Sequence, residues 1–127
     1  MANIAVEFSV SVTGETTGEM FKGVFKAIPR LSHSANLRRD QLRRDILGPK
    51  PEDAGPDAQN VAAVFSKIWV HVTEAPSWWK DSRNGLELLD ETPVAAVYDN
   101  VARIEREAVE AVRKAAETAK EELKKAP

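Results

Sequence analysis

A long helical pattern at the carboxyl end most constrains how this chain of 127 residues can fold. Thr92 followed by Pro93 is typical of a helix start, because threonine caps the first turn and proline suits its first position. From there to about Lys125 no glycine or proline interrupts the chain. Apolar residues follow three- and four-residue spacing: Val94, Val97, Val101, Ile104, Ala108, Ala111 and Ala115. Such a helix reaches about 50 Å, farther than the core of a small domain extends, so we expect 92–127 to be a long helix whose charged, alanine-rich end protrudes.

Alternating residues at the amino end predict an antiparallel β-hairpin over about 3–28. Residues 4–12 place apolar side chains on one face and mostly polar ones on the other, as a half-buried strand does. A second alternating run at 21–27 follows a turn-like stretch rich in glycine and threonine. Because an isolated hairpin is marginally stable, we expect helices to cover its apolar face, while the strand edges stay open to another chain.

A shorter helix is predicted directly after the hairpin. Ser32 is a good N-cap, and Gly48 followed by Pro49 is a typical helix stop, which together predict a helix over 33–47. The linker 48–57 contains three prolines and two glycines, so we expect it to be irregular.

A further pattern predicts a helix over about 57–72, since its apolar residues recur with helical spacing for more than four turns. Ile68, Val70 and Val72 would also fit a short strand, which is the lesser alternative. The stretch 74–91, which contains two adjacent tryptophans, shows no regular pattern and is expected to be an irregular loop.

Together these elements predict an α+β fold: an N-terminal antiparallel β-hairpin followed by three α-helices, the last of them long and partly protruding. Residues 1–91 are expected to form a compact α+β unit, and residues 92–127 the long C-terminal helix. No apolar run approaches the roughly 18 residues that span a bilayer, so no membrane contact is expected.

The chain offers few groups for catalysis. It has no cysteine and two widely separated histidines, which removes disulfides, thiolate metal sites and cysteine nucleophiles. His33 and His71 have no partner at ligand spacing and are expected to be surface or capping residues. The carboxylates of Glu87, Asp90 and Glu91 lack an accompanying histidine or glycine-rich loop. We therefore predict no catalytic, cofactor-binding or metal-binding residue, no cofactor, and a protein that is not an enzyme.

Aromatic and apolar residues provide the candidate protein interface. Trp78 and Trp79 are two of only three tryptophans, and tryptophan is enriched at binding hot spots. Because adjacent side chains point in different directions, one tryptophan is expected in the core and the other at an interface. The full candidate set is Trp78, Trp79, Val97, Tyr98, Val101 and Ile104. We expect homo-oligomers that form through the sheet edge or the long helix; the alternative is a monomer whose hairpin packs on its own helices.

A cluster of arginines in the predicted helix 33–47 is the candidate charge-complementary surface: Arg38, Arg39, Arg43 and Arg44. Residues 30–50 carry six basic and two acidic side chains, whereas residues 51–91 carry three and eight. Such segments are expected to attract each other within the chain or between subunits. A phosphate-binding stripe is the alternative, but the net charge of −2 and the interleaved acidic residues argue against nucleic acid as a partner.

Several packing and turn motifs between Arg38 and Tyr98 form a further pattern: Arg43-Arg44-Asp45-Ile46-Leu47-Gly48, Pro51-Glu52-Asp53-Ala54, Glu74-Ala75-Pro76-Ser77-Trp78-Trp79-Lys80, Gly85-Leu86-Glu87-Leu88-Leu89-Asp90-Glu91 and Val97-Tyr98. This half of the chain resembles a group of small proteins encoded in the structural-gene cluster of tailed bacteriophages and prophages. The group includes tail assembly chaperones, which escort the tape-measure protein before the tail tube polymerises around it. The resemblance supplies no catalytic residue.

The resemblance implies a non-enzymatic protein of phage tail morphogenesis that acts through protein–protein contacts, such as a tail assembly chaperone. Its partners are then other phage structural proteins, among them the tape-measure or tail-tube protein, in the cytoplasm of the bacterial host or in the virion. A virion structural subunit, such as a neck, connector or head–tail completion protein, is the first alternative. A small nucleic-acid-binding regulator that uses the arginine cluster is the second.

Overall fold

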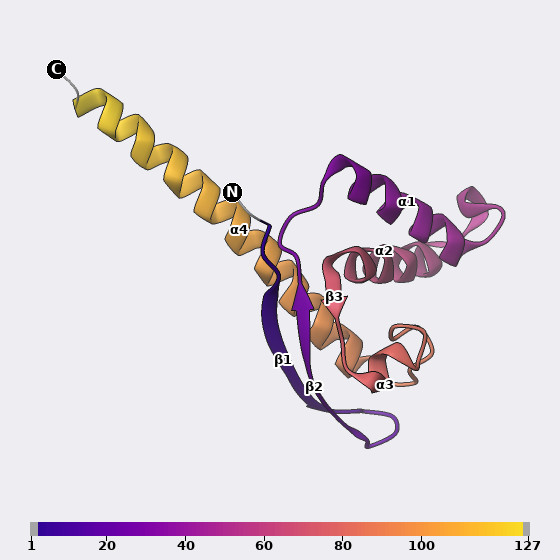
Figure 1. Cartoon of the computed structure of the whole chain (residues 1–127). Helices are drawn as coiled ribbons and strands as arrows, with labels where there is room; N and C mark the ends of the chain where they lie inside the picture. The colour runs from indigo at the N-terminus through magenta and orange to yellow at the C-terminus, as the bar shows by residue number, and fades with distance from the viewer. Residues whose placement is uncertain (1–2, 126–127) are drawn as a thin grey trace.

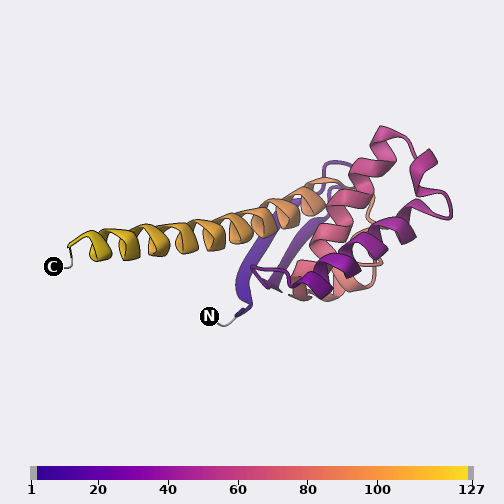
Figure 2. The same cartoon turned by 90° about the horizontal axis from the view of Figure 1, so that it is seen from above.

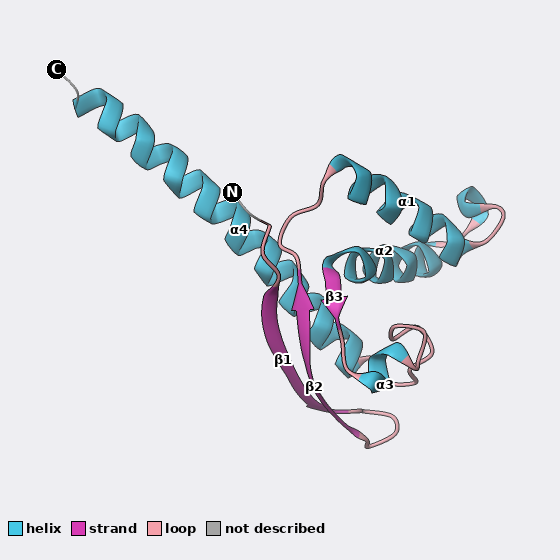
Figure 3. Cartoon of the chain, viewed as in Figure 1, coloured by secondary structure: helices cyan, strands magenta, loops and turns pink. Residues whose placement is uncertain are grey.

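The computed structural model describes residues 3–125 and has the α+β fold that the sequence predicts (Figure 3). The elements in chain order are β1 (Val6–Thr13), β2 (Met20–Ala27), α1 (His33–Leu47), the 3-10 turn η1 (Pro51–Asp53), α2 (Pro56–His71), β3 (Val72–Glu74), α3 (Ser77–Lys80) and α4 (Thr92–Lys125). The helices expected at 33–47 and 57–72 are therefore confirmed to within one residue at each end.

The sheet has a third strand in addition to the expected hairpin. Its order is β1-β2-β3, with each neighbouring pair antiparallel. β1 and β2 pair over their full length, whereas β3 pairs only with the end of β2, where Ala27 lies opposite Val72 and Lys26 opposite Glu74. The predicted helix ends at His71, and the chain then continues in extended form. The outer edge of β1 has no neighbouring strand within the described chain.

Helix α4 covers one face of the sheet, and the other long helices lie beside it. Figure 1 shows α4 running diagonally across the β1–β2 pair and continuing past it, and α4 contacts both of these strands. α2 packs against α4, and α1 packs on α2. No residue of α1 is buried, so α1 forms an outer layer of the molecule.

The core forms where the inward side chains of β1 and β2 meet α4. Phe8 of β1 stacks on Phe25 of β2 with ring centroids 5.2 Å apart. Trp79 meets the edge of the Phe25 ring at 5.6 Å. The apolar face of α4 completes the core with Val97, Val101 and Ile104. Burial of each large apolar side chain contributes roughly 1.5–3 kcal/mol, so this cluster is the main source of stability.

Both segments predicted to be irregular contain a short helical turn, which corrects that expectation. η1 lies in the linker after α1, and α3 lies in the stretch before α4. A proline begins η1 and another precedes α3, where its fixed φ suits a first turn. After α3, Gly85 has a φ of +88°, and a Cβ there would lie 2.5 Å from the Trp79 ring. This close packing requires glycine.

Helix α4 contributes to the core with its first half only. Its last buried residue is Ile104, and every residue from Ala111 to Lys125 is exposed. Figure 2 shows this second half extending away from the rest of the described chain. The core therefore extends past residue 91, the expected boundary between the compact unit and the long helix, because the sheet covers the start of α4. The last two residues of that predicted helix, 126 and 127, lie outside the described range. None of the described helices is both long enough and apolar enough to cross a membrane.

Candidate functional site

Four of the six candidate interface residues lie in the core. Trp79 is 1% exposed, and Val97, Val101 and Ile104 are buried against the sheet. Their spacing correctly indicates an apolar helix face, but the sequence does not show that the sheet of the same chain covers that face. In this fold, these four side chains are not accessible to a partner.

The other two candidates, Trp78 and Tyr98, are half-buried. Trp78 Nε1 donates a hydrogen bond to Lys22 O at 2.9 Å, and its ring lies 5.1 Å from that of Phe21. Tyr98 lines a cavity beside α2. The expectation that one of the adjacent tryptophans enters the core is confirmed by Trp79, whereas Trp78 packs across the inner face of β2.

The candidate charge-complementary surface follows α1: Arg38, Arg39, Arg43 and Arg44. Two of these arginines pair within the helix, since Arg43 Nη2 lies 3.1 Å and Arg44 Nε 3.0 Å from the carboxylate of Asp40. The hydrogen bond from Arg43 lowers the pKa of Asp40. Arg43 also donates to Gln59 Oε1 at 3.3 Å. Within residues 3–125 no ion pair joins the four arginines to the acidic segment 51–91.

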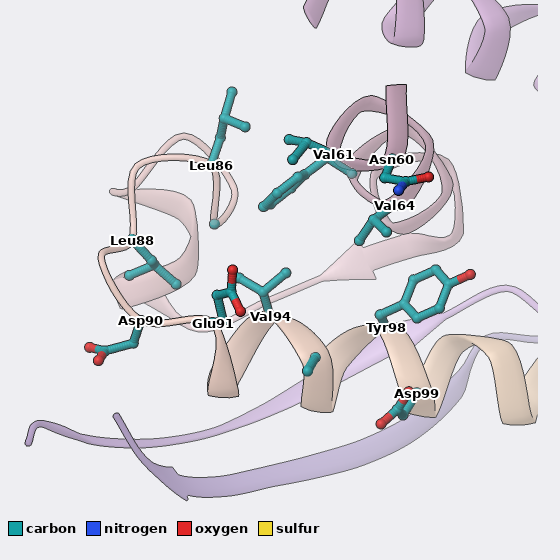
Figure 4. A pocket seen from close by; sticks show the side chains of 13 residues that line it. Asn60, Val61, Val64, Leu86, Leu88, Asp90, Glu91, Val94, Tyr98 and Asp99 are labelled. Atoms are coloured by element: carbon teal, nitrogen blue, oxygen red, sulfur yellow. The ribbon is translucent and has the colours of Figure 1, made fainter. Parts of the chain in front are cut away.

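A cavity of about 460 Å³ lies between α2, the loop that precedes α4 and the first turns of α4 (Figure 4). Its lining is mostly apolar: Val61, Val64, Phe65, Leu86, Leu88, Val94, Ala95 and Tyr98. Asn60 and Asp99 contribute polar groups, whereas Figure 4 shows the Asp90 carboxylate turned away from the other side chains. Among the described residues, no three histidine, aspartate or glutamate side chains are placed so that they could hold a metal ion.

Asp90 joins the hairpin loop to the segment before α4, a role that the sequence analysis missed. It is 2% exposed and accepts hydrogen bonds from Thr16 N at 2.6 Å and Thr17 N at 3.0 Å. The Thr17 hydroxyl also donates to it, at 2.5 Å, and this hydrogen bond lowers the pKa of Asp90. A Cβ at Gly14 would lie 2.4 Å from the Asp90 carboxyl, so the contact requires glycine at that position of the loop.

Glu15 makes the reciprocal contact, from the hairpin loop to the start of α4. Its carboxylate accepts hydrogen bonds from Glu91 N at 2.5 Å and Thr92 N at 3.0 Å, and the Thr92 hydroxyl also donates to it. These bonds, chiefly that from the Thr92 hydroxyl, lower the pKa of Glu15 to about 2. A carboxylate at a helix N-terminus is also favoured by the helix dipole. The helix start expected at Thr92 is therefore capped from a distant loop.

His71 is buried, so the prediction that it lies at the surface is wrong. Its Nδ1 lies 2.6 Å from Ile28 O, and its Nε2 lies 3.2 Å from Glu105 Oε2, so the ring connects the end of β2 to α4. Lys67 Nζ donates to Glu105 Oε1 at 2.8 Å. Partial burial raises the pKa of Glu105, but the hydrogen bond and charge of Lys67 outweigh it and leave the pKa below its usual value. Its position in the sequence could have predicted this burial. His71 follows Ile68 by three residues and therefore lies on the same, buried face of α2.

The second half of α4 carries an exposed row of apolar residues, here called the distal seam: Val109, Val112, Ala116, Ala119 and Leu123. These residues alternate at spacings of three and four, which is typical of a helix that pairs with another helix. Val109 is 62%, Val112 39% and Leu123 76% exposed. The distal seam was not predicted, because the expected apolar row continues through Ala108, Ala111 and Ala115, one residue before Val109, Val112 and Ala116. A row with alternating spacings of three and four has a period of 3.5 residues, so it drifts slowly around a helix of 3.6 residues per turn. Farther along α4, a different row of residues therefore lies on the side that faces the sheet.

Comparison of the chain with protein-family models, with curated proteins and with solved structures finds no match in any of the three.

Proposed function

We propose that the protein is a non-enzymatic assembly protein that acts through contacts with other proteins. The observation that carries this proposal is the second half of α4, where every residue from Ala111 to Lys125 is exposed and where most of the distal seam lies. Ordering these residues costs conformational entropy, and they bury no side chain within the chain. Exposed apolar residues in a regular row are a common mark of a protein-binding surface.

The proposal includes a role in tail morphogenesis of a tailed bacteriophage or prophage, with tail assembly chaperone as the particular role. This role is supported by the stretch from Arg38 to Tyr98, which resembles small proteins encoded in the structural-gene cluster of tailed bacteriophages and prophages. In this fold several of those motif residues pack the compact unit: Trp79 contacts Gly85, and Pro76 contacts Gly23. The residues that carry the resemblance therefore belong to the compact unit that holds α4 in place. In this proposal the protruding half of α4 contacts the partner. The tape-measure and tail-tube proteins are the proposed partners, in the host cytoplasm or in the virion.

Co-expression tests this role with defined partners. The tagged chain is produced together with the tape-measure or the tail-tube protein of the same phage or prophage, and the captured complex is quantified. We expect one of the two to co-purify at a fixed ratio. Leu123→Asp should reduce that ratio, whereas Leu89→Asp is the matched control, because Leu89 is equally exposed, at 76%, but lies in the loop before α4. Capture of neither protein would contradict the tail role.

Quantitative mass spectrometry of purified particles separates the chaperone from the virion subunit. A chaperone leaves before assembly is complete, so we expect the chain in infected-cell lysate and not in particles. A fixed copy number per particle would replace the chaperone role with that of a neck, connector or head–tail completion protein.

A further inference from the structure

The distal seam lies on the same side of α4 as the sheet. At 3.6 residues per turn, Ala119 follows Val101 by about five full turns and points in the same direction. Val112 is turned from Val101 by only about 20°. Val101 is buried in the core, so the apolar face of α4 continues past the edge of the sheet. Figure 2 shows that no other described element accompanies α4 there.

The exposed surface of the chain is larger than that of a compact monomer. It amounts to 8423 Å², whereas a folded monomer of 14.0 kDa exposes about 6,700 Å². The surplus of about 1,700 Å² exceeds the roughly 800 Å² that each partner buries in a standard protein interface. The chain therefore has enough unpartnered surface for a stable dimer.

Only an antiparallel partner helix fits the distal seam. A parallel partner would continue toward the start of α4 on the side that β1 and β2 already occupy. An antiparallel partner enters with its carboxyl end toward the sheet, and its own compact unit lies beyond Lys125. With Val112 opposite Ala116 of the partner helix, Val109 lies opposite Ala119. A second copy of this chain supplies a helix with this same seam.

A cavity lies where the tip of the partner helix would end. It has a volume of about 500 Å³ and lies at the base of the protruding half, with Pro29 and Leu31 on one side and Glu105 and Val109 on the other. The antiparallel register brings Leu123 of the second copy opposite Glu105 and hence to this cavity. Leu123 is 76% exposed in the single chain, and its placement between Leu31 and Val109 would remove it from water.

Charges beside the distal seam are paired within each helix. Arg113 and Lys120 follow one edge of the seam, and Glu110 and Glu117 lie farther from it around the helix. In the single chain Arg113 pairs with Glu110 and, at 2.9 Å, with Glu117 of its own helix. In the antiparallel pair the Arg113 side chains of the two copies come near each other across the two-fold axis. The pairing of each Arg113 with Glu110 and Glu117 of its own helix offsets this positive charge.

We propose that two copies of this protein pair through their distal seams as an antiparallel two-helix interface, with Leu123 of each copy seated beside Val109 of the other. The interface is isologous, so each contact occurs twice about a two-fold axis. This inference rests on the proposed assembly role and deepens it, because the dimer holds two compact units at opposite ends of a helical rod and so can bridge two partners.

Sedimentation equilibrium over about a hundredfold range of protein concentration tests the pairing. We expect the full chain to approach about 28 kDa, twice the 14.0 kDa of one copy. Val112→Asp should raise the dissociation constant about 100-fold or more, because it places a charge in the apolar seam. Leu89→Asp is the matched control and should leave the dissociation constant unchanged. A monomer at every concentration, or equal effects of both variants, would overturn the proposal.

Disulfide formation tests the antiparallel direction, and the natural chain has no cysteine to interfere. Val109→Cys and Ala119→Cys variants are mixed in equal amounts and oxidised. The antiparallel register predicts the mixed disulfide as the main product, since these positions lie opposite each other. A parallel pair would instead join Val109→Cys to itself and Ala119→Cys to itself, and this result would overturn the proposed geometry.

The same variants separate this inference from the proposed function. If Val112→Asp is monomeric and still captures the tape-measure or tail-tube protein, the dimer forms but is not needed for assembly. If the natural chain is monomeric and captures a partner, the pairing is wrong and the assembly role stands. If it is dimeric and captures neither protein, the pairing stands and the tail role fails.

Discussion

The two halves of α4 have the same secondary structure but are stabilised in different ways. In the first half, Val97, Val101 and Ile104 are buried under the sheet. In the second half, every residue from Ala111 to Lys125 is exposed. Because the first half is already helical, the second half extends it without a new nucleation step. Helical propensity therefore determines the length of α4, whereas only tertiary contacts determine which part of it is fixed to the domain.

The start of α4 is held more firmly than its end. Glu15 from the hairpin loop binds the first turn, and His71 contacts Glu105 one turn before the exposed half begins. Beyond that point the helix is supported mainly by ion pairs within itself, such as those of Arg113 with Glu110 and Glu117. This contrast between an anchored half and a free half can be tested by substitution.

The largest effect is expected from Ile104→Ala in the anchored half. Ile104 is 3% exposed, so removal of its side chain leaves a cavity and should lower the free energy of unfolding by about 2–5 kcal/mol. Val112→Ala in the free half is the matched control and should change it by less than about 0.5 kcal/mol. Urea unfolding, at a concentration where gel filtration shows a monomer, measures both. Equal losses of unfolding free energy in the two variants would show that the two halves of α4 contribute equally to stability.

The next effect is expected from His71→Leu. The substitution leaves Ile28 O without its ring partner and Glu105 without one of its two contacts, and an unpartnered buried acceptor costs about 1–3 kcal/mol. His33→Leu is the control, because His33 is exposed at the start of α1, and it should change stability by less than about 0.5 kcal/mol. Thermal unfolding of the two variants compares them, and similar melting temperatures would contradict the role of His71.

Acid should weaken the attachment of the anchored half. The pKa of Glu15 is about 2 in the fold, against 4.5 for the free side chain. Because the folded pKa is the lower one, the stabilisation is complete above about pH 5 and is lost as the pH falls toward 2. Asp90, whose pKa is also lowered, acts in the same direction. The melting temperature of the natural chain should therefore decrease from pH 5 to pH 2.

Glu15→Gln isolates the contribution of that carboxylate. The variant should melt below the natural chain at pH 7, and the difference should shrink as the pH approaches 2, where Glu15 is protonated. Glu19→Gln, in the same loop, is the control and should run parallel to the natural chain, since the Glu19 carboxylate makes no hydrogen bond to the described residues. A constant difference for Glu15→Gln at all pH values would contradict the assignment.

The smallest effect is expected from Arg113→Ala in the free half. Its ion pairs are exposed, and such pairs contribute about 0.2–0.5 kcal/mol each. Global unfolding should therefore barely change, whereas amide hydrogen exchange between residues 111 and 120 should become a few-fold faster at low salt. Lys120→Ala is the control, since Lys120 makes no ion pair within the described chain. Equal exchange rates in the two variants would show that the ion pairs do not support this half.

Local patterns were sufficient to predict most of the secondary structure. The alternation at 4–12 and the helical spacing at 57–72 and 92–125 describe how side chains repeat along a single element. The helix at 33–47 was predicted from the signals at its two ends. β3 could not be found in this way, because Val72–Glu74 is too short to show a period and exists only where β2 lies beside it. The contacts of His71 with Ile28, just after β2, and with Glu105 of α4 could likewise not be found from spacing along α2.

The candidate site was predictable in part. The long helix was correctly expected to protrude, since its length exceeds what a small domain covers. Val97, Val101 and Ile104 were expected at an interface but lie in the core, because an apolar stripe has the same spacing whether it meets its own sheet or a partner. The distal seam has that spacing too, and only the position of the sheet distinguishes the covered part of α4 from the exposed part.

The α+β class, the order of the hairpin and the three long helices, and the extent of α4 follow from the sequence, because they depend on propensity and on periodicity between near neighbours. Only the tertiary structure shows that Glu15 and Asp90 join the hairpin loop to the helix start, that His71 contacts Ile28 and Glu105, and where along α4 the core ends. Those features depend on contacts between residues far apart in the chain, and spacing along one element carries no information about them.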